Sequence, residues 1–195
     1  MLDFGRLPLP EIPALYAGLL GSAWMELAEP VRAAHASGST VRGRGRLRIA
    51  HGRGHAARWL ARLLRLPRAS QAADTWLVIT AGAGGEQWHR TFDDRRLVTR
   101  QYPAGDGELA ERFGILEFRF RLEASQGSLI FRQVEAAVVC GRVRLKIPAA
   151  WAPRVDACED PAGARRTSVH VRVELPLVGP LLRYDGTIDF KETAA

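Results

Sequence analysis

A two-residue period in side-chain character runs through most of this chain and restricts its fold more than any other feature. From residue 116 to residue 122 every second side chain is leucine or phenylalanine, and the side chains between them are glutamate or arginine. Successive side chains of a strand point to opposite faces of its sheet, so this alternation is typical of a strand. Strand-like segments fill residues 40–50 and 74–190. They predict a protein built mainly from β-strands.

The turns between these segments indicate how the strands connect. Turns rich in glycine or aspartate occur at residues 82–85, 93–94 and 102–107, and no helical pattern interrupts the series. Strands joined by short turns pair antiparallel, and a sheet with many strands twists and curls. We therefore predict an α+β fold with a curled antiparallel sheet, a half-barrel to barrel of about 8–10 strands.

Two helices are predicted in the N-terminal half, at residues 11–34 and 55–66, and both are expected to pack against the sheet. Apolar side chains recur at helical spacing in the first, where Pro30 removes a backbone donor and predicts a kink or a restart. Pro67 ends the second. With 195 residues and 47% hydrophobic composition, the chain suits a single domain over residues 1–195.

The helix at residues 55–66 permits two interpretations. Its tryptophan and leucines gather on one side and its arginines on the other. A short basic helix of this composition is typical of peripheral attachment to a membrane surface. The alternative is a helix that packs its leucines on the sheet while its arginines face water. We favour the packing helix, because a large sheet needs helices to cover it.

The positive charge of the chain raises the question of nucleic-acid binding. The formal net charge is +7 and the sequence pI is about 10.4. Only Lys146 and Lys191 are lysines, and arginines are spread from Arg6 to Arg183 among acidic residues, whereas a groove binder clusters its charge. The Arg-Gly run at residues 42–48 has a strand period and no interleaved aromatic residue. Nucleic acid is therefore an unfavoured partner, and the arginine content is typical of a GC-rich genome.

The sequence contains no segment that predicts export or membrane insertion. No apolar stretch is long enough for a spanning helix, and no charged and apolar leader marks a signal peptide. The expected location is cytoplasmic. In that compartment Cys140 and Cys158 are expected to be reduced thiols and not a disulfide.

The motifs give no support for three common chemistries. The glycines of residues 82–85 resemble a phosphate-binding loop, but no helix follows them and no Lys-Ser or Lys-Thr closes the loop. His51 and His55 have two glycines between them and no nearby Cys, Asp or Glu to complete a metal site. Neither cysteine has a neighbouring histidine that would make it a nucleophile. We predict no metal and no cofactor.

The strongest candidate for a binding site is a set of aromatic and arginine side chains on consecutive strands. Arg90 lies between Trp88 and Phe92 on one predicted strand face, and Arg100 precedes Tyr102 on a face of the next. Guanidinium groups bind carboxylate or phosphate through a fork, and aromatic rings stack on apolar groups. The alternative is a packed face whose arginines reach outward. With a tyrosine of the last strand, the candidate ligand-binding residues are Trp88, Arg90, Arg100 and Tyr184.

Glu111 is the carboxylate with the clearest candidate role. It begins a Glu-Arg-Phe-Gly turn between strands that supply Arg90 and Arg100, and a buried glutamate needs a cationic partner to stay charged. A structural ion pair between Glu111 and Arg90 is the favoured interpretation. A catalytic acid at Glu111 is the weaker alternative, because structural ion pairs also perturb pKa values.

Several short motifs together carry a resemblance that none of them carries alone. In chain order they are Leu15 to Gly21, Trp24, Val31-Arg32, His35, Gly43 to Gly54, the Leu-Ala-Arg-Leu-Leu helix before Pro67, Trp88-x-Arg90-x-Phe92, Glu111 to Gly114, and Tyr184-x-Gly186. Their order and spacing resemble the bacterial domain-of-unknown-function family 4166. The resemblance implies a domain found alone or appended to larger proteins, some with a saccharopine-dehydrogenase-like nucleotide-binding part. It implies no established activity, and any oxidoreductase chemistry would belong to a separate NAD(P)-binding partner protein.

The sequence leaves three functional hypotheses. The favoured one is a non-catalytic binding module for a small apolar or amphipathic anionic ligand, which includes lipid-like molecules. The second is an enzyme, or an accessory subunit of an oxidoreductase, that uses Glu111 and arginines. The third is a peripheral membrane-associated domain attached through residues 55–66.

Overall fold

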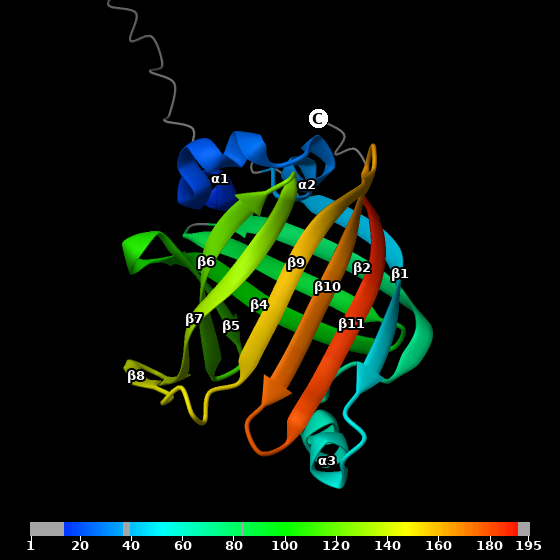
Figure 1. Ribbon diagram of the computed structural model, residues 1–195, viewed down its shortest axis with the longest axis vertical. Coiled ribbons are helices and arrows are strands. Elements are labelled where there is room, and N and C mark those ends of the chain that lie inside the picture. Colours follow the sequence, from blue (N-terminus) through cyan, green and yellow to red (C-terminus); the bar gives the residue numbers. More distant parts are fainter. Residues whose placement is uncertain (1–13, 37–39, 83, 191–195) are drawn as a thin grey trace, which may run out of the picture.

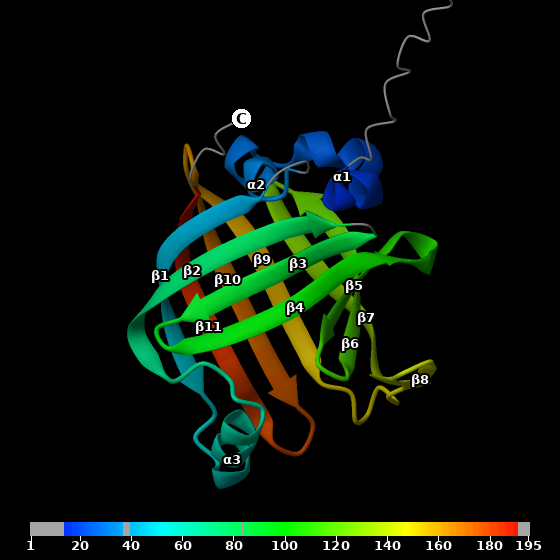
Figure 2. The ribbon, with the colours of Figure 1, turned by 180° about the vertical axis from the view of Figure 1, so that it is seen from behind.

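The computed structural model describes residues 14–36, 40–82 and 84–190. In these residues eleven strands form one antiparallel sheet, and ten of them close into a barrel (Figure 1, Figure 2). The strands are β1 (Val41–His51), β2 (Ser70–Gly82), β3 (Gly85–Phe92), β4 (Arg95–Ala104), β5 (Glu108–Phe113), β6 (Leu116–Ser125), β7 (Ser128–Cys140), β8 (Val143–Lys146), β9 (Arg154–Gly163), β10 (Arg166–Leu175) and β11 (Gly179–Phe190). The prediction of a curled antiparallel sheet in an α+β fold is confirmed.

Two pairings in the barrel join strands that are not consecutive in the chain, β1 with β11 and β7 with β9. Neighbours follow the order β6-β5-β4-β3-β2-β1-β11-β10-β9-β7, and β6 then pairs with β7 to complete the circle. β1 pairs antiparallel with β11, so the first strand lies beside the last. The short β8 pairs with the end of β7 and lies outside the ring.

β1 shows how the alternating sequence produces the barrel wall. The arginines within residues 42–48 are exposed on the outside, while Leu47 and Ile49 are buried inside. Gly45 permits a close approach of β11, because a Cβ atom at this position would lie 1.9 Å from the backbone oxygen of Thr187. The period of the sequence therefore separates solvent from core, and glycine sets how tightly the first and last strands pack.

Short helices close one end of the barrel (Figure 1). They are α1 (Leu15–Leu20), the 3-10 helix η1 (Gly21–Glu26) and α2 (Glu29–Ala34). The prediction of one helix over residues 11–34 is wrong in its continuity, because Gly21 ends α1 with a φ of 55°. Pro30 lies in the first turn of α2, which is the predicted restart. Residues 11–13 lie outside the described residues.

The helix α3 (His55–Leu63) lies at the opposite end, against β1 and β11 (Figure 1). Ala57 and Ala61 are buried, whereas Trp59 is 62% exposed and Leu63 is 60% exposed. The prediction that this helix packs its leucines on the sheet is therefore wrong for Leu63, and Trp59 on the same side of the helix is exposed as well. The physical reason is that the barrel already buries its own inner face, and small alanines fill the remaining contact at its end.

The core lies inside the barrel, where the inward side chains of its strands pack together. Phe120 contacts Phe131 edge-on with ring centroids 5.8 Å apart, and Phe92 contacts Tyr184 with centroids 5.5 Å apart. Such aromatic contacts stabilise the interior beyond the area that they bury. They fill part of the barrel and leave a cavity beside them.

Candidate functional site

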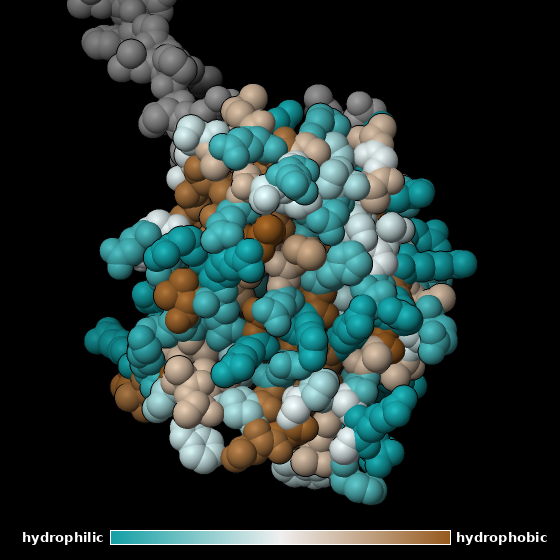
Figure 3. Space-filling view, in the orientation of Figure 1, coloured by the Kyte–Doolittle hydropathy of each residue, from teal (hydrophilic) through white to brown (hydrophobic). Residues whose placement is uncertain are grey.

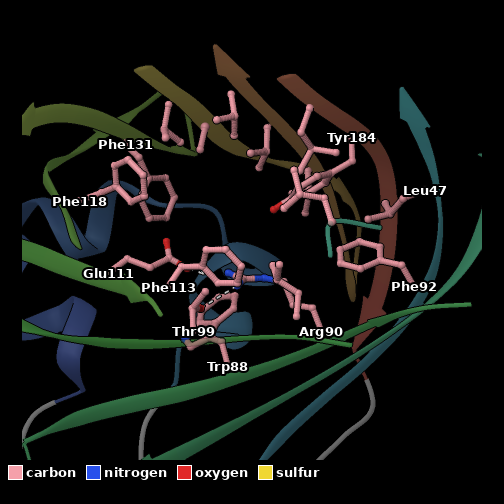
Figure 4. Close-up of a pocket in the computed structure, with 18 of the residues that line it drawn as sticks. Leu47, Trp88, Arg90, Phe92, Thr99, Glu111, Phe113, Phe118, Phe131 and Tyr184 are labelled. Atoms are coloured by element: carbon pink, nitrogen blue, oxygen red, sulfur yellow. Dashed lines mark hydrogen bonds and ion pairs between the residues drawn. The ribbon is translucent and has the colours of Figure 1, made fainter. Parts of the chain in front are cut away.

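A cavity of about 190 Å³ lies inside the barrel (Figure 4). Most of its lining consists of leucine, valine and phenylalanine side chains at inward positions of the strands. Leu64 and Leu66, which follow α3, also line it, so the cavity reaches toward the α3 end. This apolar lining follows directly from the alternating sequence, because the inner face collects every second residue.

Strand register brings four polar side chains of the lining together. Trp88 of β3 pairs with Thr99 of β4, and Gln101 of β4 pairs with Glu111 of β5. Paired residues share a face, so Thr99, Gln101 and Glu111 face inward with Arg90, which lies two residues after Trp88. Glu111 thus lies within β5 and not at the turn where the sequence predicted it.

Arg90 and Glu111 form the ion pair that the sequence predicts. Nη1 of Arg90 lies 3.2 Å from Oε1 of Glu111 and donates a second hydrogen bond to Oγ1 of Thr99 at 2.8 Å. The guanidinium carbon lies 4.6 Å from the centroid of the Trp88 ring. Burial alone lowers the pKa of Arg90, but Glu111 and two nearby tyrosines raise the pKa above its ordinary value. Arg90 is therefore a fixed cation in the wall of the cavity.

Part of this polar group faces the cavity without a protein partner. Of the side-chain surface, 14% remains accessible for Arg90 and 19% for Glu111. Among the described residues, Nε and Nη2 of Arg90 and the hydroxyl of Tyr184 have no hydrogen-bond partner. Figure 4 shows Tyr184 directed into the cavity opposite Arg90, and burial raises the pKa of its hydroxyl, which keeps the proton in place. Arg90 and Tyr184 both line the cavity, so these donors are available to a molecule inside it.

A second polar cluster lies under the helices that close the barrel. Nε2 of His35 lies 3.0 Å from Oε2 of Glu159, and the Tyr16 hydroxyl donates a 2.6 Å hydrogen bond to Oε1 of Gln101. The ring of His35 also contacts the rings of Tyr16 and Trp88, with centroids 3.9 Å and 5.5 Å away. Burial raises the pKa of Tyr16 well above its ordinary value, so its hydroxyl remains a donor. The cluster ties the helices to the barrel wall.

Two interruptions of the alternating pattern mark this second cluster in the sequence. On β9 the inward side chains are Val155, Ala157 and Glu159, so a carboxylate occupies a position where the alternation calls for an apolar residue. Gln101 interrupts the inward face of β4 in the same way. Their partners on the helices are remote in sequence, and no local pattern identifies them.

Arg100 does not line the cavity. It pairs with Gln87 on the outer wall and is exposed, and Tyr102 is also directed outward, where its hydroxyl donates to Glu117. Arg100 and Arg90 therefore face opposite sides of the sheet, and Arg100, a candidate ligand-binding residue from the sequence, does not share the cavity with the other three. The reason is the two-residue turn at residues 93–94, which pairs even-numbered residues of β3 with odd-numbered residues of β4.

The described residues also bear on metal binding, on cysteine chemistry and on membrane insertion. None of these residues form a group of three or more His, Cys, Asp or Glu side chains suited to a metal ion. Cys140 and Cys158 are free, and burial raises the pKa of the Cys158 thiol to about 11, which disfavours the nucleophilic thiolate. No helix in residues 14–36, 40–82 and 84–190 combines the length and hydrophobicity needed to cross a membrane.

Comparison with known proteins adds a family match. A family model described as a domain of unknown function, DUF4166, matches residues 27–188. The match begins just before α2 and continues into β11, so it includes the barrel and the polar side chains of the cavity. No curated protein and no solved structure matches the chain. Its function must therefore be argued from the site.

Proposed function

This chain belongs to the DUF4166 family, and we propose that it is a non-catalytic binding module for a small, largely apolar ligand with an anionic or otherwise hydrogen-bond-accepting head group. One observation carries the proposal. An apolar cavity presents unpaired N–H and O–H donors from Arg90 and Tyr184. Binding sites for small molecules typically combine an apolar lining with a few placed polar groups.

The dimensions of the cavity fit a small ligand. An engineered apolar cavity of about 150 Å³ holds benzene, and the cavity here is about 190 Å³. A ring or a short aliphatic chain would contact the leucine and phenylalanine walls. Its head group would accept hydrogen bonds from Nε or Nη2 of Arg90 and from the hydroxyl of Tyr184.

The charges at the site favour binding over catalysis. A carboxylate head group would approach a cation whose charge is already shared with Glu111, so the hydrogen bonds would fix the orientation of the ligand more than they would attract it. Oε1 of Glu111 already accepts a hydrogen bond from Arg90 at 3.2 Å, so the ion pair occupies the oxygen that would otherwise face a substrate. The enzyme alternative at Glu111 is for this reason the less supported one.

A displacement assay tests the proposal. The purified protein is loaded with the fluorophore 1-anilinonaphthalene-8-sulfonate, which is then displaced by octanoate, octanol or octylamine. We expect octanoate and octanol to displace the dye and octylamine to be weaker, because an ammonium group cannot accept hydrogen bonds from Arg90. Failure of all three to displace the dye would contradict the proposal.

Variants separate the cavity from the outer wall. Arg90→Met and Tyr184→Phe are each expected to weaken octanoate binding about tenfold, the equivalent of one hydrogen bond to a charged group. Arg46→Met removes an arginine whose side chain is 76% accessible on the outer wall and serves as the matched control. Circular dichroism confirms that each variant is folded. Octanoate affinity that is equal in Arg90→Met and Arg46→Met would remove Arg90 from the site.

A further inference from the structure

The helix α3 presents its large apolar side chains to solvent. Trp59 and Leu63 lie one helical turn apart, so they share a face, and both are more than half exposed. Burial of Ala57 and Ala61 fixes the helix on the barrel with this face outward. Exposed tryptophan and leucine at helical spacing have no structural role in the described contacts.

Further apolar side chains are exposed at the same end of the molecule. Trp151, in the segment between β8 and β9, is 64% exposed, and Leu177, in the turn between β10 and β11, is 89% exposed. The ribbon places this turn and the start of β9 at the end that carries α3 (Figure 1, Figure 2). In the space-filling view, hydrophilic side chains cover much of the barrel wall, and apolar side chains reach the surface at both ends, this end included (Figure 3). Leu177 also holds a φ of 66°, a conformation that costs energy for leucine and favours glycine.

The charge of this end is positive. Residues 51–69, 147–153 and 175–179, which contain α3 and the two other segments, include no Asp or Glu, although Asp94 of the turn after β3 pairs with Arg68 at 3.5 Å. Among the described residues, Arg53, Arg58, Arg62 and Arg65 form no salt bridge. On the outer wall, Arg46 by contrast pairs with an aspartate of β2 at 3.5 Å.

We propose that this end of the barrel docks on the surface of an anionic phospholipid membrane. The exposed tryptophan and leucine side chains would enter the boundary between headgroups and acyl chains, where tryptophan is favoured. The unpaired arginines would lie at the depth of the lipid phosphates, and each basic residue near such a surface adds to the attraction. The docking surface is defined as Trp59, Leu63, Trp151 and Leu177 with the arginines of α3 and its flanks.

The proposed docking also places the cavity relative to the membrane. Because Leu64 and Leu66 line the cavity directly after α3, docking would bring this end of the cavity to the membrane surface. The docking does not depend on the cavity being occupied.

A second copy of the chain is a poorer occupant of the surface, because a two-fold contact would bring the same arginines face to face.

Vesicle sedimentation tests the docking with the full chain. Vesicles of phosphatidylcholine alone are compared with vesicles of phosphatidylcholine and phosphatidylglycerol, at low and at high salt. We expect binding to the anionic vesicles and weak binding to the neutral ones, with a loss at high salt because counter-ions screen the arginines. Equal binding to both vesicles, or to neither, would overturn the proposal.

Paired variants show whether α3 is the contact. Arg58→Gln with Arg62→Gln is expected to lower the vesicle partition coefficient at least about tenfold, from the contribution of two basic residues near an anionic surface. Trp59→Ser with Leu63→Ser is expected to lower it by a similar factor while the charge stays constant. Exposure of these side chains predicts folded variants, which circular dichroism verifies.

A control variant on the barrel wall tests whether a loss of vesicle binding is only a general effect of net charge. Arg46→Gln with Trp76→Ser removes one arginine and one tryptophan that is 46% exposed on the barrel wall. This variant should bind the anionic vesicles within about twofold of the parent chain, since neither residue lies at the α3 end. An equal loss in the control and in the α3 variants would overturn the proposal. A dimer in sedimentation equilibrium that Trp59→Ser dissociates would also overturn it, because the face would then belong to a second copy.

Discussion

Replacement of Arg90 by methionine is expected to destabilise the barrel through the charge that it leaves behind. The substitution removes the contact with Oε1 of Glu111 at 3.2 Å and the hydrogen bond to Thr99 at 2.8 Å. Removing one partner of a buried ion pair costs about 3–5 kcal/mol. The Glu111 side chain keeps 19% of its surface accessible to the cavity, where water can solvate it, so we expect the lower end of this range, about 3 kcal/mol.

A double-mutant cycle isolates the pair from the other losses. Glu111→Gln keeps the shape of the side chain and an oxygen that accepts from Arg90, so its cost should be smaller, about 1–2 kcal/mol. Arg90→Met already removes the partner of Glu111. The destabilisation of the double variant should therefore be smaller than the sum of the two single destabilisations by about 1–2 kcal/mol. Urea unfolding followed by tryptophan fluorescence and circular dichroism gives the four free energies, and coincident transitions justify a two-state treatment.

The cycle has a clear contradicting result. If the two single effects add within about 0.5 kcal/mol, Arg90 and Glu111 are not energetically coupled and the interior ion pair does not stabilise the fold. Arg46→Met supplies the matched control, because its side chain is 76% accessible and its ion pair on the outer wall should contribute under about 1 kcal/mol.

Three further predictions concern other parts of the barrel, each measured by urea unfolding. Gly45→Ala should destabilise the protein by about 1–3 kcal/mol, because the added Cβ atom would clash with the backbone of β11. Gly82→Ala should not destabilise it, because a Cβ atom at that position meets nothing within 4 Å. Equal effects of the two substitutions would contradict the close approach of β1 and β11. Tyr16→Phe should cost about 1–3 kcal/mol because buried Gln101 loses its hydrogen-bond donor, and a neutral effect would show that another donor replaces it. Burial raises the pKa of Glu117, but hydrogen bonds from neighbouring side chains outweigh it, so the pKa in the folded protein lies below its ordinary value. The ionised Glu117 side chain therefore stabilises the fold above the unfolded pKa of about 4.3, and this stabilisation is lost as the pH falls through the lower folded pKa. Glu117→Gln should therefore destabilise the protein at neutral pH and weaken the loss of stability on acidification, and an unchanged acid profile would contradict this.

The inward side of each strand can be predicted from its alternation, whereas the relation between two strands depends on the turn that joins them. Alternation identified Trp88 and Arg90 as neighbours on one face, and both line the cavity. Alternation within a strand does not fix which residues of the next strand share its face, so it leaves the side of Arg100 open. The turn at residues 93–94 does fix it, since a two-residue connection pairs Trp88 with Thr99.

The helices illustrate a different limit. The apolar spacing of α3 was evident in the sequence, but spacing does not say whether the apolar side faces the protein or something outside it. The apolar side of such a helix faces the protein only where a sheet has an inner face left to cover, and a closed barrel already covers its inner face. The pairing of His35 with Glu159 depends on contacts across 124 positions of sequence and could not be inferred from either local pattern.

The pairing of β1 with β11 has a consequence for how the protein is made. Residues 41–51 leave the ribosome early, but their neighbour on one side, residues 179–190, is synthesised last among the described strands. Until then β1 and β10 each have an unpaired edge, which is a template for association with other chains. Pairing between such distant strands carries a large entropy cost and slows folding. The wall that carries Tyr184 is thus the last to be added, and the cavity comes into existence in the same step that removes the exposed edges.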